Sequence, residues 1–273
     1  MDLGIRDLYE KVLDYEGQNI FSEILSLWVE DNNYKAYLNQ LPDIVSNNSN
    51  QKFSVEDSWE LYALSRVLDT LTLRFQPNKK ADGSEWLGPE LTLMEYIKFI
   101  EAIGLKVINL YEYTPFHHEI FEAVTGEVNF QISKMLFPPV ILRGLLIKRG
   151  GVVITLNPMS FDLDTVNNST IYWAYRRKNR KYADLSQGWG SNSQWRTKFR
   201  FDFDQGEYYL YNSEGKIDLN SPSQKDIDDL NEGNLSLNEA VEITVNRHFI
   251  TSKKRDTDLF PYDYKYLEKK NHS

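Results

Sequence analysis

The chain contains no cysteine, few histidines and no long hydrophobic run. Without cysteine it can form no disulfide, thiolate metal site, iron–sulfur cluster or cysteine nucleophile, which argues against a small secreted scaffold. The longest apolar stretch, residues 135–147, is interrupted by Pro138, Pro139, Arg143 and Gly144, and it is shorter than the ~20 residues of a membrane-spanning helix. The N-terminus carries acids where a signal peptide carries positive charge. We therefore expect a protein of the reducing cytoplasm with no membrane partner.

Aromatic side chains are abundant: the chain has 17 tyrosines, 14 phenylalanines and six tryptophans. Disordered chains contain few large apolar groups, so this composition predicts a folded protein. At roughly 150 residues per domain, 273 residues provide one large or two modest domains. We favour two, because the hydrophobic pattern changes near residue 105.

The first hundred residues have a helical pattern. Apolar residues recur three and four positions apart in residues 20–28 and 59–68, which predicts a helix in each. Two pairs have the spacing of a capping box ahead of an apolar run, namely Ser54 with Asp57 and Thr92 with Glu95. Gly104 stands where the second capped helix should end.

From Leu105 onward the apolar period becomes two, which is typical of strands. The predicted strands are residues 106–111, 116–124, 151–156, 170–177, 194–203 and 207–211. Turn residues at 150–151 and 204–207 predict two hairpins. A further capping box at 236–239 predicts a late helix over 237–245, and the polar stretch 213–233 is predicted to be an exposed loop.

These patterns together predict an α+β fold. It has a mainly helical N-terminal part, followed by a mixed, mostly antiparallel β-sheet part with a late helix. We place the boundary between a helical domain, residues 1–104, and an α+β domain with an antiparallel sheet, residues 105–273.

The formal charge of −9 is unevenly distributed. Residues 1–172 carry a net charge of −10, residues 173–200 carry +7, and residues 201–273 carry −6. The middle segment holds eight basic side chains, one acid and three of the six tryptophans. This basic segment is the strongest anomaly in the sequence, and it is where we expect a binding site.

In the basic segment, a strand over 194–204 would place aromatic residues on its core face and basic residues on the other. Those basic residues could bind an anion or an acidic protein surface, or could pair with acids at the surface. The preceding loop, 188–194, places Trp189 between glycines, which suits either a ligand-binding loop or a loop pinned by its own hydrogen bonds. The candidate residues for ligand or partner binding are Arg176, Arg177, Trp189, Asn192, Gln194, Arg196 and Arg200.

Two of the four histidines lie in the predicted strand 116–124. Alternation there turns His118 inward and places His117 on the same face as Glu119. His117 and Glu119 are therefore the candidate catalytic pair, for proton transfer. With His248 they could also supply three metal ligands, although nothing in the sequence brings the three together. The alternative is that these histidines are structural, and the sequence assigns no cofactor.

The sequence lacks the motifs of P-loop, dinucleotide-binding, serine-hydrolase and zinc-protease sites. Three strings, YWA at 172–174, GWGSNSQWRT at 188–197 and DLFPY at 258–262, resemble an uncharacterised family of bacterial cytosolic proteins. The resemblance covers about the C-terminal 160 residues. It implies a bacterial cytosolic protein and transfers no catalytic role.

Three classes of function remain. The first is a protein-binding module, of an immunity or defence type, that recognises a partner through a basic aromatic surface. The alternative is an enzyme or sensor for a small anionic ligand such as a nucleotide, using His117, Glu119 and the Trp189 loop. Nucleic-acid binding is disfavoured, because a chain with a charge of −9 and a pI of about 5.1 repels a polyanion. The sequence decides neither whether the protein is an enzyme nor its oligomeric state.

Overall fold

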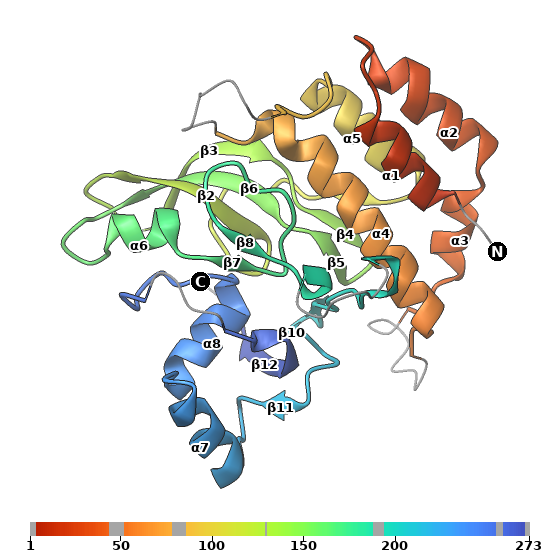
Figure 1. The fold of residues 1–273 in the computed structure, drawn as a ribbon. Helices are drawn as coiled ribbons and strands as arrows, with labels where there is room; N and C mark the ends of the chain where they lie inside the picture. Colours follow the sequence, from red (N-terminus) through yellow and green to blue (C-terminus); the bar gives the residue numbers. More distant parts are fainter. Residues whose placement is uncertain are drawn as a thin grey trace.

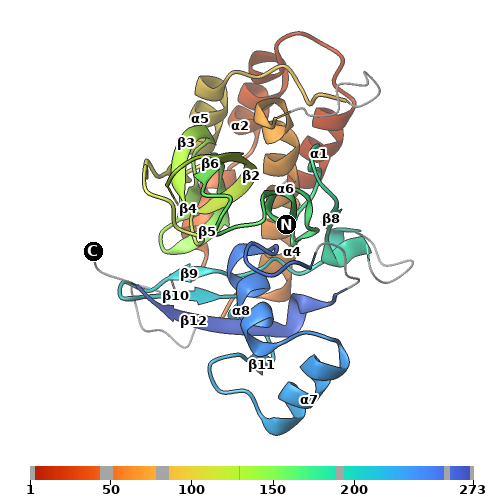
Figure 2. The ribbon, with the colours of Figure 1, turned by 90° about the vertical axis from the view of Figure 1, so that its left-hand side faces the viewer.

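The computed structural model describes residues 4–43, 52–77, 86–128, 130–187, 194–254 and 259–270. Within these ranges the chain has the predicted α+β fold: helices come first, strands follow, and two further helices precede the last strand (Figure 1). The two groups of helices lie at opposite ends of the molecule, with the strands between them (Figure 2).

The N-terminal part is helical, as predicted. Its helices are α1 (Ile5–Leu13), α2 (Ser26–Asp31), which continues a π-helical turn (Phe21–Leu25), α3 (Tyr34–Gln40), α4 (Val55–Leu71) and α5 (Leu93–Ala102). The capping boxes that open α4 and α5 are both formed. Gly104 follows α5 with a φ of 89°, a left-handed conformation that glycine adopts without strain. The helix therefore ends where the sequence predicted.

The largest sheet has seven strands, and all of its pairs are antiparallel except that of β11 with β12. In spatial order the strands are β1 (Lys106–Val107), β4 (Val140–Leu142), β5 (Leu145–Lys148), β9 (Phe203–Asp204), β10 (Tyr208–Tyr211), β12 (Tyr264–Lys269) and β11 (Ile217–Asp218). The hairpin predicted at 204–207 joins β9 to β10.

A second sheet has the order β2-β6-β3 and comprises β2 (His118–Thr125), β6 (Gly150–Leu156) and β3 (Gln131–Phe137). The hairpin predicted at 150–151 is wrong, because β5 and β6 belong to different sheets. Arg149 is the single residue between these two strands. The chain therefore passes from one sheet to the other at a buried arginine.

Three predicted strands are largely absent. The strand predicted over 106–111 is reduced to β1, Lys106–Val107. The strand predicted over 170–177 is reduced to β7 (Ile171–Tyr172), which pairs with β8 (Tyr182–Ala183). It ends because Trp173 has a φ of 52°, outside the extended region. Residues 194–196 form a 3₁₀ turn instead of strand, and only Phe203–Asp204 of the predicted 194–204 is extended in a sheet.

The segment before β9 is not a strand because its backbone bonds to side chains and loops. The amide of Phe199 donates to Ser58 Oγ at 3.0 Å. Phe199, Phe201 and Phe203 are buried as alternation predicted, but so is Arg200, which was placed on the outer face. The prediction of an exposed basic face is therefore wrong at Arg200.

The polar stretch 213–233 is not an exposed loop. It contains β11 and α7 (Gln224–Glu232), whose first turn is closed by a capping box between Ser223 and Asp226. The predicted late helix is confirmed as α8 (Leu237–Asn246), opened by the box at Ser236. A short helix, α6 (Leu163–Asn168), precedes β7.

One buried hydrophobic cluster crosses the predicted boundary at residue 104. It joins α1, α4 and α5 to strands β3, β4 and β5 and to the phenylalanines of 199–203. The helical and sheet parts thus share a core, and α4 packs directly beside β5. Buried side chains of α4 and β5 consequently face the chain segments that carry the basic residues.

Candidate functional site

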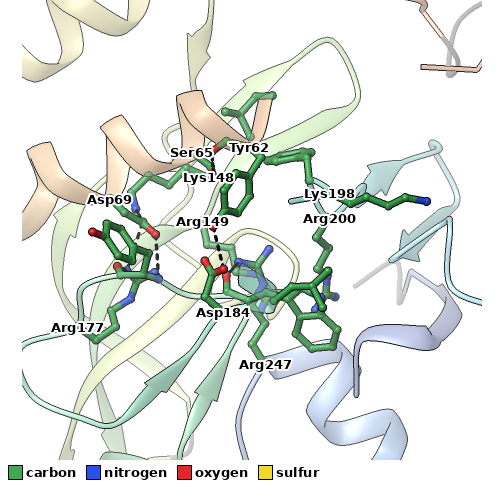
Figure 3. Close-up of a pocket in the computed structure, with 15 residues that line it drawn as sticks. Tyr62, Ser65, Asp69, Lys148, Arg149, Arg177, Asp184, Lys198, Arg200 and Arg247 are labelled. Atoms are coloured by element: carbon green, nitrogen blue, oxygen red, sulfur yellow. Dashed lines mark hydrogen bonds and ion pairs between the residues drawn. The ribbon is translucent and has the colours of Figure 1, made fainter. Parts of the chain in front are cut away.

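A partly open cavity lies where α4, the end of β5, the segment after β7 and the end of α8 meet (Figure 3). Its volume is about 60 Å³. Most of its walls are polar or charged side chains, and the charged residues that line it are Asp69, Lys148, Arg149, Arg177, Asp184, Lys198, Arg200 and Arg247. Six of these eight are basic, in a protein that is acidic overall.

At one end of the cavity, three arginines lie near one carboxylate, and two of them contact it. Nε of Arg200 donates to Oδ1 of Asp202 at 2.8 Å, and NH2 of Arg247 lies 3.3 Å from Oδ2. Arg149 pairs with no carboxylate in the described part of the chain, and its NH2 donates to the carbonyl of Val245 at 2.7 Å. We call Arg149, Arg200, Arg247 and Asp202 the arginine cluster.

The C-terminus of α8 offsets part of this positive charge. Arg200 donates to the carbonyl of Thr244 at 2.6 Å, and Arg149 to that of Val245, both in the last turn of the helix. A helix C-terminus carries about half a negative charge. Three guanidiniums against one carboxylate and this dipole leave an excess of roughly 1.5 positive charges.

Several guanidinium nitrogens of the arginine cluster are buried without a hydrogen-bond partner among the described residues. They are Nε and NH1 of Arg149, NH1 of Arg200 and Nε of Arg247. Arg149 is 2% exposed and Arg200 6% exposed, so bulk water does not reach them. Buried polar groups normally have partners, and charged ones cost the most when they do not.

The pKa values of Arg149 and Arg200 reflect the same excess of positive charge. Burial, together with the neighbouring Arg247 and Arg149 charges, lowers the pKa of Arg200 to about 9. Burial and Arg247 likewise lower the pKa of Arg149 to about 10. Both side chains stay protonated at neutral pH, and the surrounding acids do not balance them. An added anion would stabilise these charges.

The opposite end of the cavity is electrostatically balanced. Nε and NH2 of Arg177 hold both oxygens of Glu119 at 2.6 and 3.0 Å, and NH1 lies 3.3 Å from Asp69. Lys148 also pairs with Asp69. Burial alone would raise the pKa of Glu119, but the Arg177 charge holds it at about 2. Two acids therefore neutralise two bases here, which leaves no excess charge for a ligand.

Tyr62 and Asp184 lie between the two ends (Figure 3). The hydroxyl of Tyr62 donates to Asp184 at 2.8 Å, and Arg66 contacts the same carboxylate at 3.4 Å. The Arg66 guanidinium also lies 3.6 Å from the centre of the Tyr175 ring. This group fixes α4 against the segment that follows β8.

The structure places the basic candidates from the sequence in different surroundings. Arg177 and Arg200 line the cavity. Arg176 lies over the rings of Trp86 and Tyr175, outside the cavity lining. Arg196 is exposed and lies 5.9 Å from the Trp59 ring centre.

The loop singled out in the sequence cannot be placed in the site. Trp189 and Asn192 lie outside the described residues, and of Gln194 only the backbone is described, in a 3₁₀ turn. Leu185 and Lys198, on either side of that loop, line the cavity.

The candidate catalytic and metal-binding residues do not share this cavity. The structure places them at separate positions: Glu119 pairs with Arg177, His117 Nδ1 contacts the hydroxyl of Thr114 at 2.9 Å, and Nδ1 of His248 contacts the carbonyl of Phe249 at 2.9 Å. His117 and His248 are absent from the cavity walls. In the described part of the chain, no three metal-ligating side chains come together. Burial lowers the pKa values of His117 and His118 to about 4, so both are neutral at pH 7.

Sequence reasoning missed Arg149, Arg247 and Asp202. One signal was present: Lys148 and Arg149 are consecutive basic residues between two apolar runs, 145–147 and 150–154. Charged residues inside a buried strand region are exceptional and need a specific partner. Nothing in the local sequence indicates that Arg247 belongs to the arginine cluster, since this depends on where the end of α8 lies in the fold.

Comparison of the chain with models of protein families, with curated proteins and with solved structures found no match. Among the described helices, none combines the length and apolar character required to cross a membrane.

Proposed function

We propose that the protein binds a small, doubly charged oxyanion, the phosphate group of a phosphate ester, in the arginine cluster. The observation that carries this proposal is the meeting of three guanidinium groups in the wall of one cavity, with a single carboxylate paired to two of them. Guanidinium groups are the preferred partners of phosphate in proteins, because their planar array of donors matches its oxygens.

Charge supports phosphate over a carboxylate. The arginine cluster has an excess of roughly 1.5 positive charges after the α8 C-terminus is counted. A phosphate monoester carries about −1.5 to −2 at pH 7, whereas a carboxylate carries only one charge. Water in the cavity could satisfy the hydrogen bonds of the guanidinium groups but would leave their charge unbalanced.

Size supports a single anionic group. A cavity needs about 10–15 Å³ to hold one water molecule. The 60 Å³ of this cavity therefore corresponds to roughly four waters. One tetrahedral oxyanion group fits such a space, and a complete nucleotide does not.

The first function predicted from the sequence, a protein-binding module of an immunity or defence type that recognises a partner through a basic aromatic surface, receives less support. Of the eight basic side chains in 173–200, four are buried: Arg177, Lys178, Arg180 and Arg200. Much of the basic segment is therefore turned into the protein. A cytoplasmic location belongs to the proposal as well, since phosphate esters are cytoplasmic metabolites and the chain has no cysteine to oxidise.

Anion-dependent thermal stability tests the proposal. The melting temperature is measured with phosphate and sulfate against chloride at constant ionic strength. A ligand that binds only the folded protein at 100 times its Kd stabilises it by about 2.7 kcal/mol. In a chain of this length that corresponds to a rise of about 5–10 °C in the melting temperature.

Arg180→Gln provides a matched control for Arg149→Gln. Arg180 is also buried, also has an unpartnered Nε and also has a pKa lowered by burial to about 10, but it does not line the cavity. We expect Arg149→Gln to abolish the shift and Arg180→Gln to retain it. If the wild-type protein shows no shift with either oxyanion, or if both variants lose it equally, the proposal is wrong.

A further inference from the structure

A second cavity adjoins the arginine cluster. It has a volume of about 250 Å³ and shares Trp173, Leu185, Lys198, Phe199 and Arg200 with the walls of the first. Because five residues line both cavities, the two cavities lie side by side. This second cavity is not needed to hold a phosphate group, and no other feature of the proposed function explains it.

Four of the eleven residues that line the second cavity are aromatic: Trp173, Phe199, Phe260 and Tyr262. The ring centre of Tyr262 lies 5.2 Å from that of Trp173 and 4.9 Å from that of Phe260, with interplanar angles of 77° and 73°. The Arg200 guanidinium lies 4.1 Å from the Trp173 ring centre. The same arginine thus touches the anion site and the aromatic wall.

The outer edge of the second cavity is polar and open to solvent. Phe260 is 47% exposed, and Lys216 and Asp263 form an exposed ion pair at 3.0 Å. Asn212 also lines this cavity and holds the chain that follows Tyr262 through its side-chain amide. Ligand sites commonly combine apolar or aromatic walls with a few polar groups in this way.

We infer that the phosphate ester carries a planar ring, so that the ligand is of the nucleoside monophosphate class. Its phosphate occupies the arginine cluster and its ring lies against Trp173, Phe260 and Tyr262. This inference rests on the proposed function, because it assumes that the arginine cluster binds the phosphate. Stacking of a base on aromatic side chains contributes about 1–3 kcal/mol. The volume of about 250 Å³ is large enough for one ring system.

Calorimetric titration of the full chain with four probes tests the inference. The probes are inorganic phosphate, ribose 5-phosphate, adenosine 5′-monophosphate and adenosine. We expect the nucleoside monophosphate to bind at least tenfold more tightly than ribose 5-phosphate, and adenosine alone to bind far more weakly than either phosphate ester.

Phe260→Ala tests whether the planar ring of the ligand lies in the second cavity. It should remove most of the tenfold gain and leave the affinity for inorganic phosphate unchanged. Tyr111→Ala is the matched control, because Tyr111 is an exposed aromatic residue (83%) that lines neither cavity. If inorganic phosphate binds and the ring adds nothing, or if Phe260→Ala keeps the gain, the inference fails and the proposed function stands. If none of the phosphate-containing probes binds, the proposed function fails with it.

Discussion

The ion pair between Arg200 and Asp202 joins two buried residues of one short segment, with Nε of Arg200 2.8 Å from Oδ1 of Asp202. The same carboxylate also accepts from Arg247 and from the backbone amide of Asn212. Among the described residues, it is the one carboxylate paired with the arginine cluster. When no anion is bound, Asp202 therefore provides the negative side chain that partly neutralises the arginine cluster in the folded protein.

Asp202→Asn should be strongly destabilising for this reason. Removal of one partner of a buried ion pair typically costs about 3–5 kcal/mol, because the remaining charge is left uncompensated. We expect phosphate or sulfate to restore more stability to this variant than it adds to the wild type. Urea unfolding with and without the anion measures both effects.

The control is Asp218→Asn. Asp218 lies 3.7 Å from Lys265 and is 46% exposed, so its pair should contribute less than about 1 kcal/mol. Similar losses in the two variants, or a loss in Asp202→Asn that no oxyanion reduces, would contradict the account of the arginine cluster.

Glu119→Gln tests whether Glu119 stabilises the fold rather than taking part in ligand binding. It removes the bidentate acceptor of Arg177 at the balanced end of the cavity, so we expect a loss of about 3–5 kcal/mol. Anion affinity should change little, since the excess charge is at the other end. Calorimetry on the folded variant measures the affinity, and Glu90→Gln, in an exposed pair with Arg74, is the control for stability. A proton-transfer role for Glu119 predicts the opposite, a variant that folds normally.

The pKa of Glu119 also gives the sign of a pH effect. Its carboxyl titrates near 4.5 when unfolded and near 2 when folded. The unfolded chain therefore binds more protons between these values, so this contribution is present above about pH 4.5 and is lost as the pH falls toward 2.

Local chemistry explains what the sequence predicted well. The capping boxes at Ser54, Thr92 and Ser236 formed because each needs only residues within one helical turn. Ser223 and Asp226 have the same spacing and form the capping box of α7. The polar residues around them are typical of a loop, so the sequence did not predict this helix. The helix has Leu230 as its buried residue, so it lacks the apolar periodicity that predicts a helix.

Tertiary contacts explain what the sequence could not predict. The predicted strand over 194–204 would have turned Arg200 outward, but Arg200 pairs with the buried Asp202. Arg177, in the same basic segment, pairs with the buried Glu119. The arginine cluster combines residues from β5's end, the segment before β9 and the end of α8. No sequence period relates Arg149 to Arg247, so only the fold reveals that they meet.

Three buried histidines predict a loss of stability in mild acid. Burial lowers the pKa values of His117 and His118 to about 4 and that of His248 well below 6.5. Each group binds a proton more readily unfolded than folded, so stability is full above about pH 6.5 and falls as the pH decreases toward 4. A shift from 6.5 to 4 corresponds to roughly 3 kcal/mol for each of His117 and His118.

Urea unfolding between pH 6.5 and 5 isolates this effect, because most carboxylates titrate at lower pH. His118→Asn should reduce the slope of stability against pH in that window. A wild-type slope near zero would show that the histidines titrate normally in the folded protein.

Arg247 provides the sharpest test, because its backbone and its side chain have opposite effects on stability. It ends α8 with a φ of 69°, a left-handed conformation that costs a non-glycine residue about 1–2 kcal/mol. Glycine would relieve this strain but would remove a guanidinium from the arginine cluster. Arg247→Gly should therefore be about 1 kcal/mol more stable than Arg247→Ala, while both variants lose at least tenfold in phosphate affinity.

Asn234→Gly is the control for the backbone effect. Asn234 has a φ of 53° and lies two residues beyond α7, away from the cavity walls. This change should raise stability and leave phosphate affinity unaltered, as measured by urea unfolding and calorimetry. Wild-type affinity in Arg247→Gly would mean that Arg247 is retained for the structure of the helix end alone. Loss of affinity in both Arg247 variants, with the stability difference between them preserved, would assign its side chain to the anion.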